Sequence, residues 1–217
     1  MIRGIVFDMD GVVIDSHPVH RLAWKKFLEA TGREVNDSDL EFILDGRKRD
    51  EILQYFLGEL TPSQVAEYGA IKDDMLQQLR KQLQPLPGVE KFLSCLSASG
   101  VRIALATSAG RRRACGTLDE LGLAKYFETI VTGDEVVYGK PDPAIYRLVA
   151  QRLDEAPEDL VAIEDAVSGV KSAMAAGMRC VGVASAERAE GLRAAGASPV
   201  ITDFQGFSLD ELKAGFG

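Results

Sequence analysis

The chain has 217 residues, enough for one medium domain that carries an insertion, and its 46% hydrophobic and 27% charged residues are typical of a globular protein. A formal net charge of -8 gives a nucleic-acid or membrane-surface role little electrostatic support. The three cysteines are widely spaced and form no CxxC pair, which argues against a disulfide framework or a zinc site. The first apolar run is too short for a signal peptide, and no stretch approaches the roughly 20 apolar residues of a membrane span. We therefore expect a soluble, cytoplasmic protein with reduced thiols.

Short apolar runs alternate with segments of helical spacing along most of the chain. The runs predict buried strands over residues 2–7, 101–106, 129–132, 160–163 and 179–183, with a short edge strand at 200–201. Helical spacing is found in residues 88–99, 114–121, 143–152 and 167–176. This alternation predicts an α/β fold with a parallel sheet covered by helices on both faces.

Residues 16–84 interrupt that alternation, because they show only helical patterning. Val19, Ala23, Trp24 and Phe27 share one face of a first helix, and a capping-box pattern at residues 61–64 opens a long helix that extends towards residue 82. Pro85, Pro87 and Gly88 mark the return to the main domain. We therefore predict a core domain of residues 1–15 and 85–217, and a helical cap domain of residues 16–84 inserted after the first strand.

The first predicted strand runs directly into two acidic residues. Asp8 and Asp10 are spaced i, i+2, which places both carboxylates on the same side of an extended backbone. Two like charges buried together are costly, so the pair predicts a metal ion, a raised pKa or both. Gly11 permits a tight bend just beyond them. A strand end with two solvated acids is the simpler alternative for this motif alone.

Polar residues also follow three other predicted strand ends. Thr107 and Ser108, followed by Ala109, can bind a phosphate through hydroxyl and backbone N–H groups. Lys140 lies in a rigid Gly-Lys-Pro loop, and Glu164 with Asp165 ends the strand at 160–163. In a parallel sheet these ends meet at one edge, where oxygen ligands from several strands suit Mg²⁺. The combination predicts a phosphate and magnesium site, although each motif alone has an ordinary structural explanation.

The four elements resemble the motifs of the haloacid dehalogenase superfamily over essentially the whole chain. FDMDGVVIDS is similar to its first motif, ATS to its second, GKPDP to its third and IED to its fourth. The helical insertion after the first motif resembles the cap of the branch of β-phosphoglucomutase and phosphoglycolate phosphatase. The resemblance implies a Rossmann-like core and an aspartyl-phosphate intermediate.

The resemblance also implies a role for each matching residue. Asp8 would attack phosphorus, and Asp10 would protonate the leaving oxygen and then accept a proton from the incoming water or hydroxyl. Thr107 and Lys140 would hold the phosphoryl oxygens. The implied ligands of Mg²⁺ are Asp8, the Asp10 carbonyl and Asp165, with Glu164 bound directly or through water. The residues expected to contact the substrate are Gly11, Ser108 and Ala109.

Cap residues should bind the rest of the substrate. The resemblance places His20, Trp24, Gly46, Arg49 and Lys72 there, although Trp24 also fits simple helix packing. A mutase must grip a second phosphate, for which Arg47, Lys48 and Arg49 are candidates and Arg111 a substitute. We expect at most one of Arg111, Arg112 and Arg113 to face the pocket.

The sequence leaves three functions open. A monomeric, magnesium-dependent phosphatase for a small phosphorylated metabolite, such as a sugar phosphate, is ahead of a hexose-phosphate mutase of the β-phosphoglucomutase type. The mutase motifs after residue 108 and after Arg49 are only partly reproduced, because residues 109–113 read AGRRR and residue 52 is isoleucine. A non-catalytic binding protein is a remote third alternative. Asp10 favours phosphate esters over carbon–halogen bonds, because an alkoxide leaving group needs a proton.

Overall fold

The computed structural model describes residues 2–43 and 49–216, and this part of the chain contains a six-stranded sheet. All strand pairs are parallel, and the spatial order is β3-β2-β1-β4-β5-β6. The strands are β1 (Gly4–Phe7), β2 (Arg102–Thr107), β3 (Thr129–Thr132), β4 (Leu160–Glu164), β5 (Arg179–Val183) and β6 (Val200–Ile201). The predicted α/β fold with a parallel sheet is confirmed.

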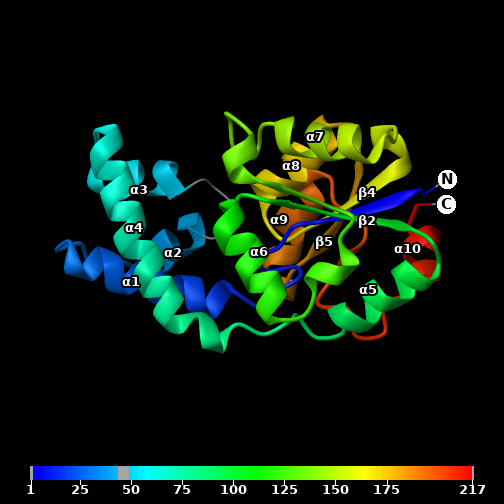
Figure 1. Cartoon of the computed structure of the whole chain (residues 1–217), viewed down its shortest axis with the longest axis horizontal. Coiled ribbons are helices and arrows are strands. Elements are labelled where there is room, and N and C mark those ends of the chain that lie inside the picture. The colour runs from blue at the N-terminus through cyan, green and yellow to red at the C-terminus, as the bar shows by residue number, and fades with distance from the viewer. Residues whose placement is uncertain (1, 44–48, 217) are drawn as a thin grey trace.

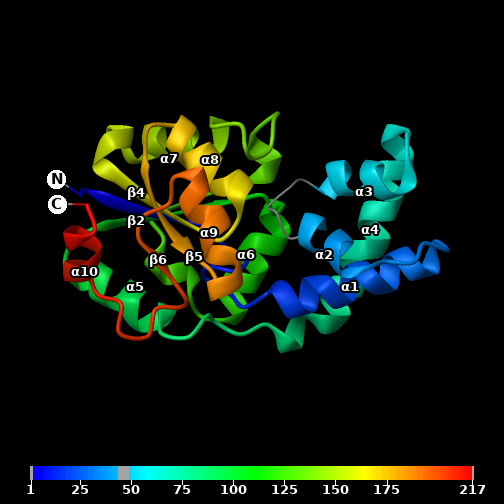
Figure 2. The same ribbon diagram turned by 180° about the vertical axis from the view of Figure 1, so that it is seen from behind.

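Helices cover both faces of this sheet (Figures 1 and 2). Strand β1 shows why both faces are apolar: Ile5 and Phe7 pack in one core cluster, whereas Val6 between them packs in the other. One cluster includes side chains of α5 (Val89–Ala98), α6 (Arg111–Glu120) and α10 (Leu209–Ala214). The other includes side chains of α7 (Ala144–Leu153), α8 (Val167–Ala175) and α9 (Ala186–Ala195). Short 3₁₀ turns lie at Arg80–Gln82, Ala124–Tyr126, Gly133–Glu135 and Pro157–Asp159.

Helix boundaries differ from the sequence prediction where the apolar pattern is weak. Helix α6 begins at Arg111, three residues before the predicted start, because its first turn is made of polar arginines. Helix α9 was not predicted, and only Ala189 and Leu192 of its residues are buried. A helix with so few buried apolar positions has a sequence pattern that cannot be distinguished from that of a loop.

The helices of the insertion lie beyond one end of the sheet, on the opposite side from both chain termini (Figure 1). They are α1 (His17–Ala30), α2 (Asp37–Ile43), α3 (Arg49–Leu57) and α4 (Pro62–Leu79). Their contacts form a separate apolar cluster around Trp24, Phe27 and Leu53. The capping box at the start of α4 is present, because the Thr61 N–H donates to Gln64 Oε1 at 2.9 Å and the Gln64 N–H donates to Thr61 Oγ1 at 3.3 Å. Among the described residues, no helix is both long and apolar enough to cross a membrane.

The two connections between the insertion and the sheet lie side by side. The Asp15 N–H donates to the Gln84 carbonyl at 2.9 Å, and the Leu86 N–H donates to the Val13 carbonyl at 3.0 Å. The first connection follows directly from the turn that contains Asp8 and Asp10. A movement of the helical insertion would therefore act on the chain close to these carboxylates. The division into domains at residues 15/16 and 84/85 remains our interpretation, and it coincides with this paired crossing.

Phe92 is the centre of an aromatic group beneath the sheet. Its ring stacks on Phe204 with centroids 5.3 Å apart, and it packs against Phe7 in an edge-to-face arrangement with centroids 6.2 Å apart.

We expect Phe92→Ala to lower the free energy of unfolding by about 3–5 kcal/mol, because it removes a buried ring from a close-packed core. Urea denaturation monitored by circular dichroism measures this. Lys91→Ala, at the exposed neighbouring position of α5, should change stability by less than about 0.5 kcal/mol. An equal loss in both variants would contradict the assignment of Phe92 to the core.

Candidate active site

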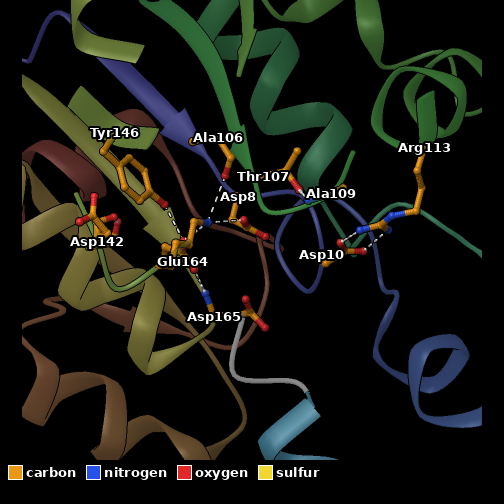
Figure 3. Close-up of polar contacts among 12 residues, drawn as sticks. Asp8, Asp10, Ala106, Thr107, Ala109, Arg113, Asp142, Tyr146, Glu164 and Asp165 are labelled. Atoms are coloured by element: carbon orange, nitrogen blue, oxygen red, sulfur yellow. Dashed lines mark hydrogen bonds and ion pairs between the residues drawn. The ribbon is translucent and has the colours of Figure 1, made fainter. Parts of the chain in front are cut away.

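The strand order brings three of the predicted strand ends together. Strand β1 lies between β2 and β4, and Phe7 is in register with Leu105 on one side and Ile163 on the other. Asp8 therefore emerges between Thr107 and the pair Glu164–Asp165, at the carboxyl edge of the sheet (Figure 3). This is also the point where the strand order changes direction, which is the usual ligand position in an open α/β sheet.

Lys140 joins these strand ends through its ammonium group. Its Nζ donates to Asp8 Oδ1 at 2.6 Å, to Glu164 Oε1 at 2.5 Å and to the Ala106 carbonyl at 3.1 Å. These three acceptors match the three N–H donors of a lysine, whose side chain is almost completely buried here. Burial alone would lower the pKa of Lys140, but the carboxylates of Asp8 and Glu164 raise it above the ordinary value. Lys140 is therefore a permanent positive charge at this edge.

Three buried carboxylates surround the same point. Oxygen atoms of Asp8, Glu164 and Asp165 all lie within 4.8 Å of one another. Burial raises the pKa of Asp8 well above its ordinary range; the Lys140 charge opposes this, and the neighbouring carboxylates reinforce it. One ammonium cannot offset three carboxylates, so the cluster fits a hard divalent cation with oxygen ligands. Among the described residues, no other group of at least three acidic, histidine or cysteine side chains meets this geometry.

His17 is a member of the site that the sequence analysis did not identify. Its Nε2 lies 2.6 Å from Asp165 Oδ2, and Arg188 donates to the Asp165 carbonyl at 3.1 Å. Burial alone would lower the pKa of His17, but its hydrogen bond and attraction to Asp165 raise it. Gly11 faces these same groups, because a Cβ at this position would lie 2.3 Å from Asp165 Oδ2 and 2.4 Å from His17 Nε2. With φ at +76°, Gly11 is required for the close approach of the backbone and is not itself a lining residue.

Asp10 forms a second polar group between the sheet and the helical insertion. Arg113 donates to Asp10 Oδ1 at 3.1 Å and to Oδ2 at 2.5 Å (Figure 3). Its guanidinium also lies 3.3 Å from His20 Nε2. Burial alone would raise the pKa of Asp10, but Arg113 and His20 hold it well below its usual range. Burial lowers the pKa of His20 to about 4, although Asp10 opposes the shift. The resting pair is therefore an ionised Asp10 with a neutral His20.

Both groups open into a cavity of about 500 Å³ between the sheet edge and the helical insertion. The predicted residues that line it are Asp8, Asp10, His20, Trp24, Arg49, Lys72, Thr107, Ser108, Ala109, Lys140, Glu164 and Asp165. Thr107 is held by the Ala109 N–H, which donates to its hydroxyl oxygen at 3.1 Å. Trp24 was expected either to pack between helices or to face the substrate. It belongs to the apolar cluster of the insertion, and the centroid of its ring also lies 5.2 Å from Lys72 Nζ at the cavity.

The arginines of α6 differ from the prediction. Arg111 does not line the cavity; its side chain is more than half exposed, and its guanidinium lies 3.3 Å from Glu135 Oε1. Arg112 and Arg113 line the cavity instead, so two of the three arginines face it rather than at most one. The cause is the start of the helix at Arg111, since each following position turns by about 100° and the third points at Asp10. Gly46, Arg47 and Lys48 lie outside the described residues.

The carboxylate cluster generates a prediction that needs no substrate. We expect a divalent cation to raise the melting temperature of the metal-free protein, because binding to the folded state alone stabilises it by about 2.7 kcal/mol at 100 times Kd. Asp165→Asn should remove most of this increase, whereas Asp119→Asn, at an exposed position of α6, should retain it. Differential scanning fluorimetry with Mg²⁺ and Mn²⁺ measures the shift. An undiminished shift in Asp165→Asn would show that the cation binds elsewhere.

Known proteins resemble this chain in sequence and in structure. The family model of haloacid dehalogenase-like hydrolases matches residues 2–177. A phosphorylated carbohydrates phosphatase of Thermotoga maritima is 35% identical over 178 residues, which cover 81% of this chain and 82% of that protein. The β-phosphoglucomutase of Bacillus subtilis is 35% identical over 190 residues, with 83% of each chain covered. The crystal structure of CbbY from Rhodobacter sphaeroides with phosphate superimposes with a TM-score of 0.83 at 27% identity, covering 98% of this chain and 100% of that one.

Members of this family typically use a divalent cation, and the cluster of Asp8, Glu164 and Asp165 has the composition to hold one. The resemblance inferred from the four motifs is thus confirmed by the family match and by relatives that include both phosphatases and a phosphomutase. The chain belongs to the haloacid dehalogenase-like hydrolases and is an enzyme of their phosphatase and phosphomutase group.

Proposed function

We propose that the protein is a Mg²⁺-dependent phosphatase that hydrolyses a small phosphorylated metabolite, such as a sugar phosphate, through an aspartyl-phosphate on Asp8. The observation that carries this proposal is the position of Asp8. Lys140 holds its carboxylate at the floor of a cavity of about 500 Å³, next to the carboxylates of Glu164 and Asp165. The names of similar proteins support the substrate class, because they include a phosphatase for phosphorylated carbohydrates and one for fructose 1-phosphate.

The first chemical step belongs to Asp8. Its carboxylate attacks phosphorus, while Lys140 and Thr107 hold the phosphoryl oxygens and offset the charge that develops on them. Asp8, Asp165 and the main-chain carbonyl of Asp10 would hold Mg²⁺, with Glu164 beside them, and the cation would let an anionic carboxylate approach an anionic phosphate. Lys140 already contacts the attacking carboxylate, and it must give up one of its three hydrogen bonds to bind a phosphoryl oxygen.

Asp10 carries the protons. In the resting site, Arg113 and His20 keep its carboxylate ionised, so Asp10 must take up a proton from solvent before it can protonate the leaving oxygen. We infer that a bound phosphate dianion competes for Arg113 and thereby weakens the interaction that keeps Asp10 ionised. After the leaving group departs, the Asp10 carboxylate accepts a proton from the water that attacks the phosphoaspartate.

The cations of the cavity favour hydrolysis over phosphate transfer between sugar positions. Arg49 forms an ion pair with Asp73 at 2.5 Å, Lys72 Nζ lies 3.9 Å from the same residue, and Arg113 binds Asp10. A second phosphate bound at any of these three cations would have to displace a carboxylate, although Arg112 also lines the cavity. Neutral hydroxyl groups can instead share such ion pairs by hydrogen bonds. The β-phosphoglucomutase relative keeps a mutase as the second candidate function.

We also propose that the enzyme acts as a monomer in the cytoplasm. The large apolar side chains that are exposed in the described residues are spread over α1, α3, α4, α8 and the loop before Lys140. Such a distribution suits a protein without a large partner surface. Cys95, Cys115 and Cys180 are free, which is consistent with a reducing compartment.

A panel of phosphorylated metabolites tests the proposed reaction. We expect wild-type protein with Mg²⁺ to release phosphate from at least one sugar phosphate, and Asp8→Asn to lower kcat by about 10³-fold or more, because it lacks the nucleophile. Asp10→Asn should lower kcat by about 10²- to 10⁴-fold through loss of proton transfer. Phosphate release is measured colorimetrically.

The same panel separates the candidate functions. Conversion of β-glucose 1-phosphate to glucose 6-phosphate with the bisphosphate primer, faster than release of phosphate, would identify a mutase instead. Neither release nor transfer with any member would contradict both proposals. Unchanged activity in Asp8→Asn would remove the catalytic assignment itself.

The lowered pKa of Lys72 leads us to expect that substrate binding depends on pH. Burial and the nearby Arg113 lower its pKa to about 8, although Asp73 opposes the shift. The amine is therefore charged below about pH 8 and neutral above it, so KM should rise about tenfold as the pH increases through this value. Lys72→Met should have a raised KM that no longer changes there, whereas Lys91→Met, on the exposed surface of α5, should behave as wild type. A wild-type KM that stays constant between pH 7 and 9 (about one unit on either side of that pKa) would exclude a charged Lys72 from the substrate.

A further inference from the structure

Tyr146 is a buried tyrosine of α7 that none of the proposed steps uses. Its side chain has no exposed surface, although it carries a hydroxyl group. The hydroxyl donates to Glu164 Oε1 at 2.6 Å, at the end of strand β4 (Figure 3). A buried hydroxyl needs a hydrogen-bond partner, and a neutral acceptor would be enough. Here the acceptor is a carboxylate, which forms a stronger hydrogen bond. The contact therefore links α7 directly to the carboxylate cluster.

The same oxygen of Glu164 also accepts from Lys140. The two donors converge on Oε1, with Lys140 Nζ at 2.5 Å, while the Asp165 N–H donates to Oε2 at 3.2 Å. Lys140 Nζ lies 5.2 Å from the centroid of the Tyr146 ring, so the tyrosine contacts both members of the ion pair. Glu164 is therefore held at both oxygens, and the Tyr146 hydroxyl is one of its three donors.

The opposite side of the Glu164 carboxylate is bounded by Gly169. A Cβ at this position would lie 2.1 Å from the carboxyl atoms of Glu164, so the carboxylate lies directly against the backbone of α8. No side chain of residue 169 can hold the carboxylate from that side. Its orientation depends on the donors on the other side, among which Tyr146 is the only uncharged side chain in the part of the chain that the structure describes.

We propose that Tyr146 is a positioning residue, whose hydroxyl orients the Glu164 carboxylate for the divalent cation. This proposal rests on the proposed function, because it concerns the same cation site. Hydrogen bonds to the groups around a metal typically change its affinity by about 10- to 100-fold. Tyr146 acts through Glu164, so its hydroxyl sets the affinity for the cation without touching the phosphorylated substrate.

Calorimetric titration of the metal-free full chain with Mn²⁺ and with Mg²⁺ tests this role. Tyr146→Phe retains the buried ring and removes only the hydroxyl, and we expect Kd for both cations to rise about tenfold. At saturating Mg²⁺, kcat should return to within about threefold of wild type, because the substrate contacts are intact. Tyr126→Phe, which changes a partly buried tyrosine packed on the other face of the sheet, should leave Kd within about twofold.

A double-mutant cycle shows whether the effect passes through Glu164. In a Glu164→Gln background, Tyr146→Phe should change Kd by less than about twofold, since the carboxylate that it orients is absent. The proposal would be overturned if Tyr146→Phe still changed Kd tenfold in that background. It would also be overturned if Tyr146→Phe alone bound Mn²⁺ as the wild type does while its metal-free melting temperature fell. Calorimetry needs no turnover, so this result is independent of whether the wild type releases phosphate from the metabolite panel.

Discussion

The contact of the buried Lys140 ammonium with Asp8 and Glu164 is the interaction on which the rest of the site depends. It joins the carboxyl ends of β1 and β4, and its third hydrogen bond to the Ala106 carbonyl joins β2 as well. Without this charge, the buried carboxylates of Asp8 and Glu164 would lose the counter-ion that they share, although His17 would still contact Asp165. Lys140 allows the cluster to exist in the folded chain, and the remaining negative charge makes it a receptor for a divalent cation.

A second ion pair lies where the core meets the helical insertion. Arg113 of α6 binds Asp10 and reaches His20 of α1, so the carboxylate that we propose as the proton-transfer group lies at the boundary between the two parts. The helical insertion also supplies Lys72, Arg49 and Trp24 to the cavity wall. The proposed function thus places the phosphoryl chemistry at the edge of the sheet and substrate selection at the boundary with the insertion. The proton carrier belongs to both, and we infer that substrate binding and proton transfer are coupled at Asp10.

The fold and the floor of the site could be predicted from the sequence because their signals are local. Each functional strand end follows an apolar run, and parallel strands place such ends at one edge of the sheet. The wall of the cavity could not be predicted in the same way. Which arginine of α6 faces Asp10 depends on where the helix begins, and that start carries no apolar signal. His17 was missed because its partner, Asp165, is distant in the sequence and is reached only in the folded chain.

The sequence by itself therefore determined the family and the parallel sheet, and it supplied the residues that we propose for the phosphoryl site, because each depends on short motifs and on the alternation of strands and helices. Only the tertiary structure decided how the charges are paired. It paired Arg113 with Asp10, joined His17 to Asp165, and placed the Tyr146 hydroxyl on Glu164. The physical reason is that an ion pair or hydrogen bond requires a separation of about 3 Å. Strand order, helix starts and the position of the helical insertion together set such distances, whereas no single segment of the sequence contains them.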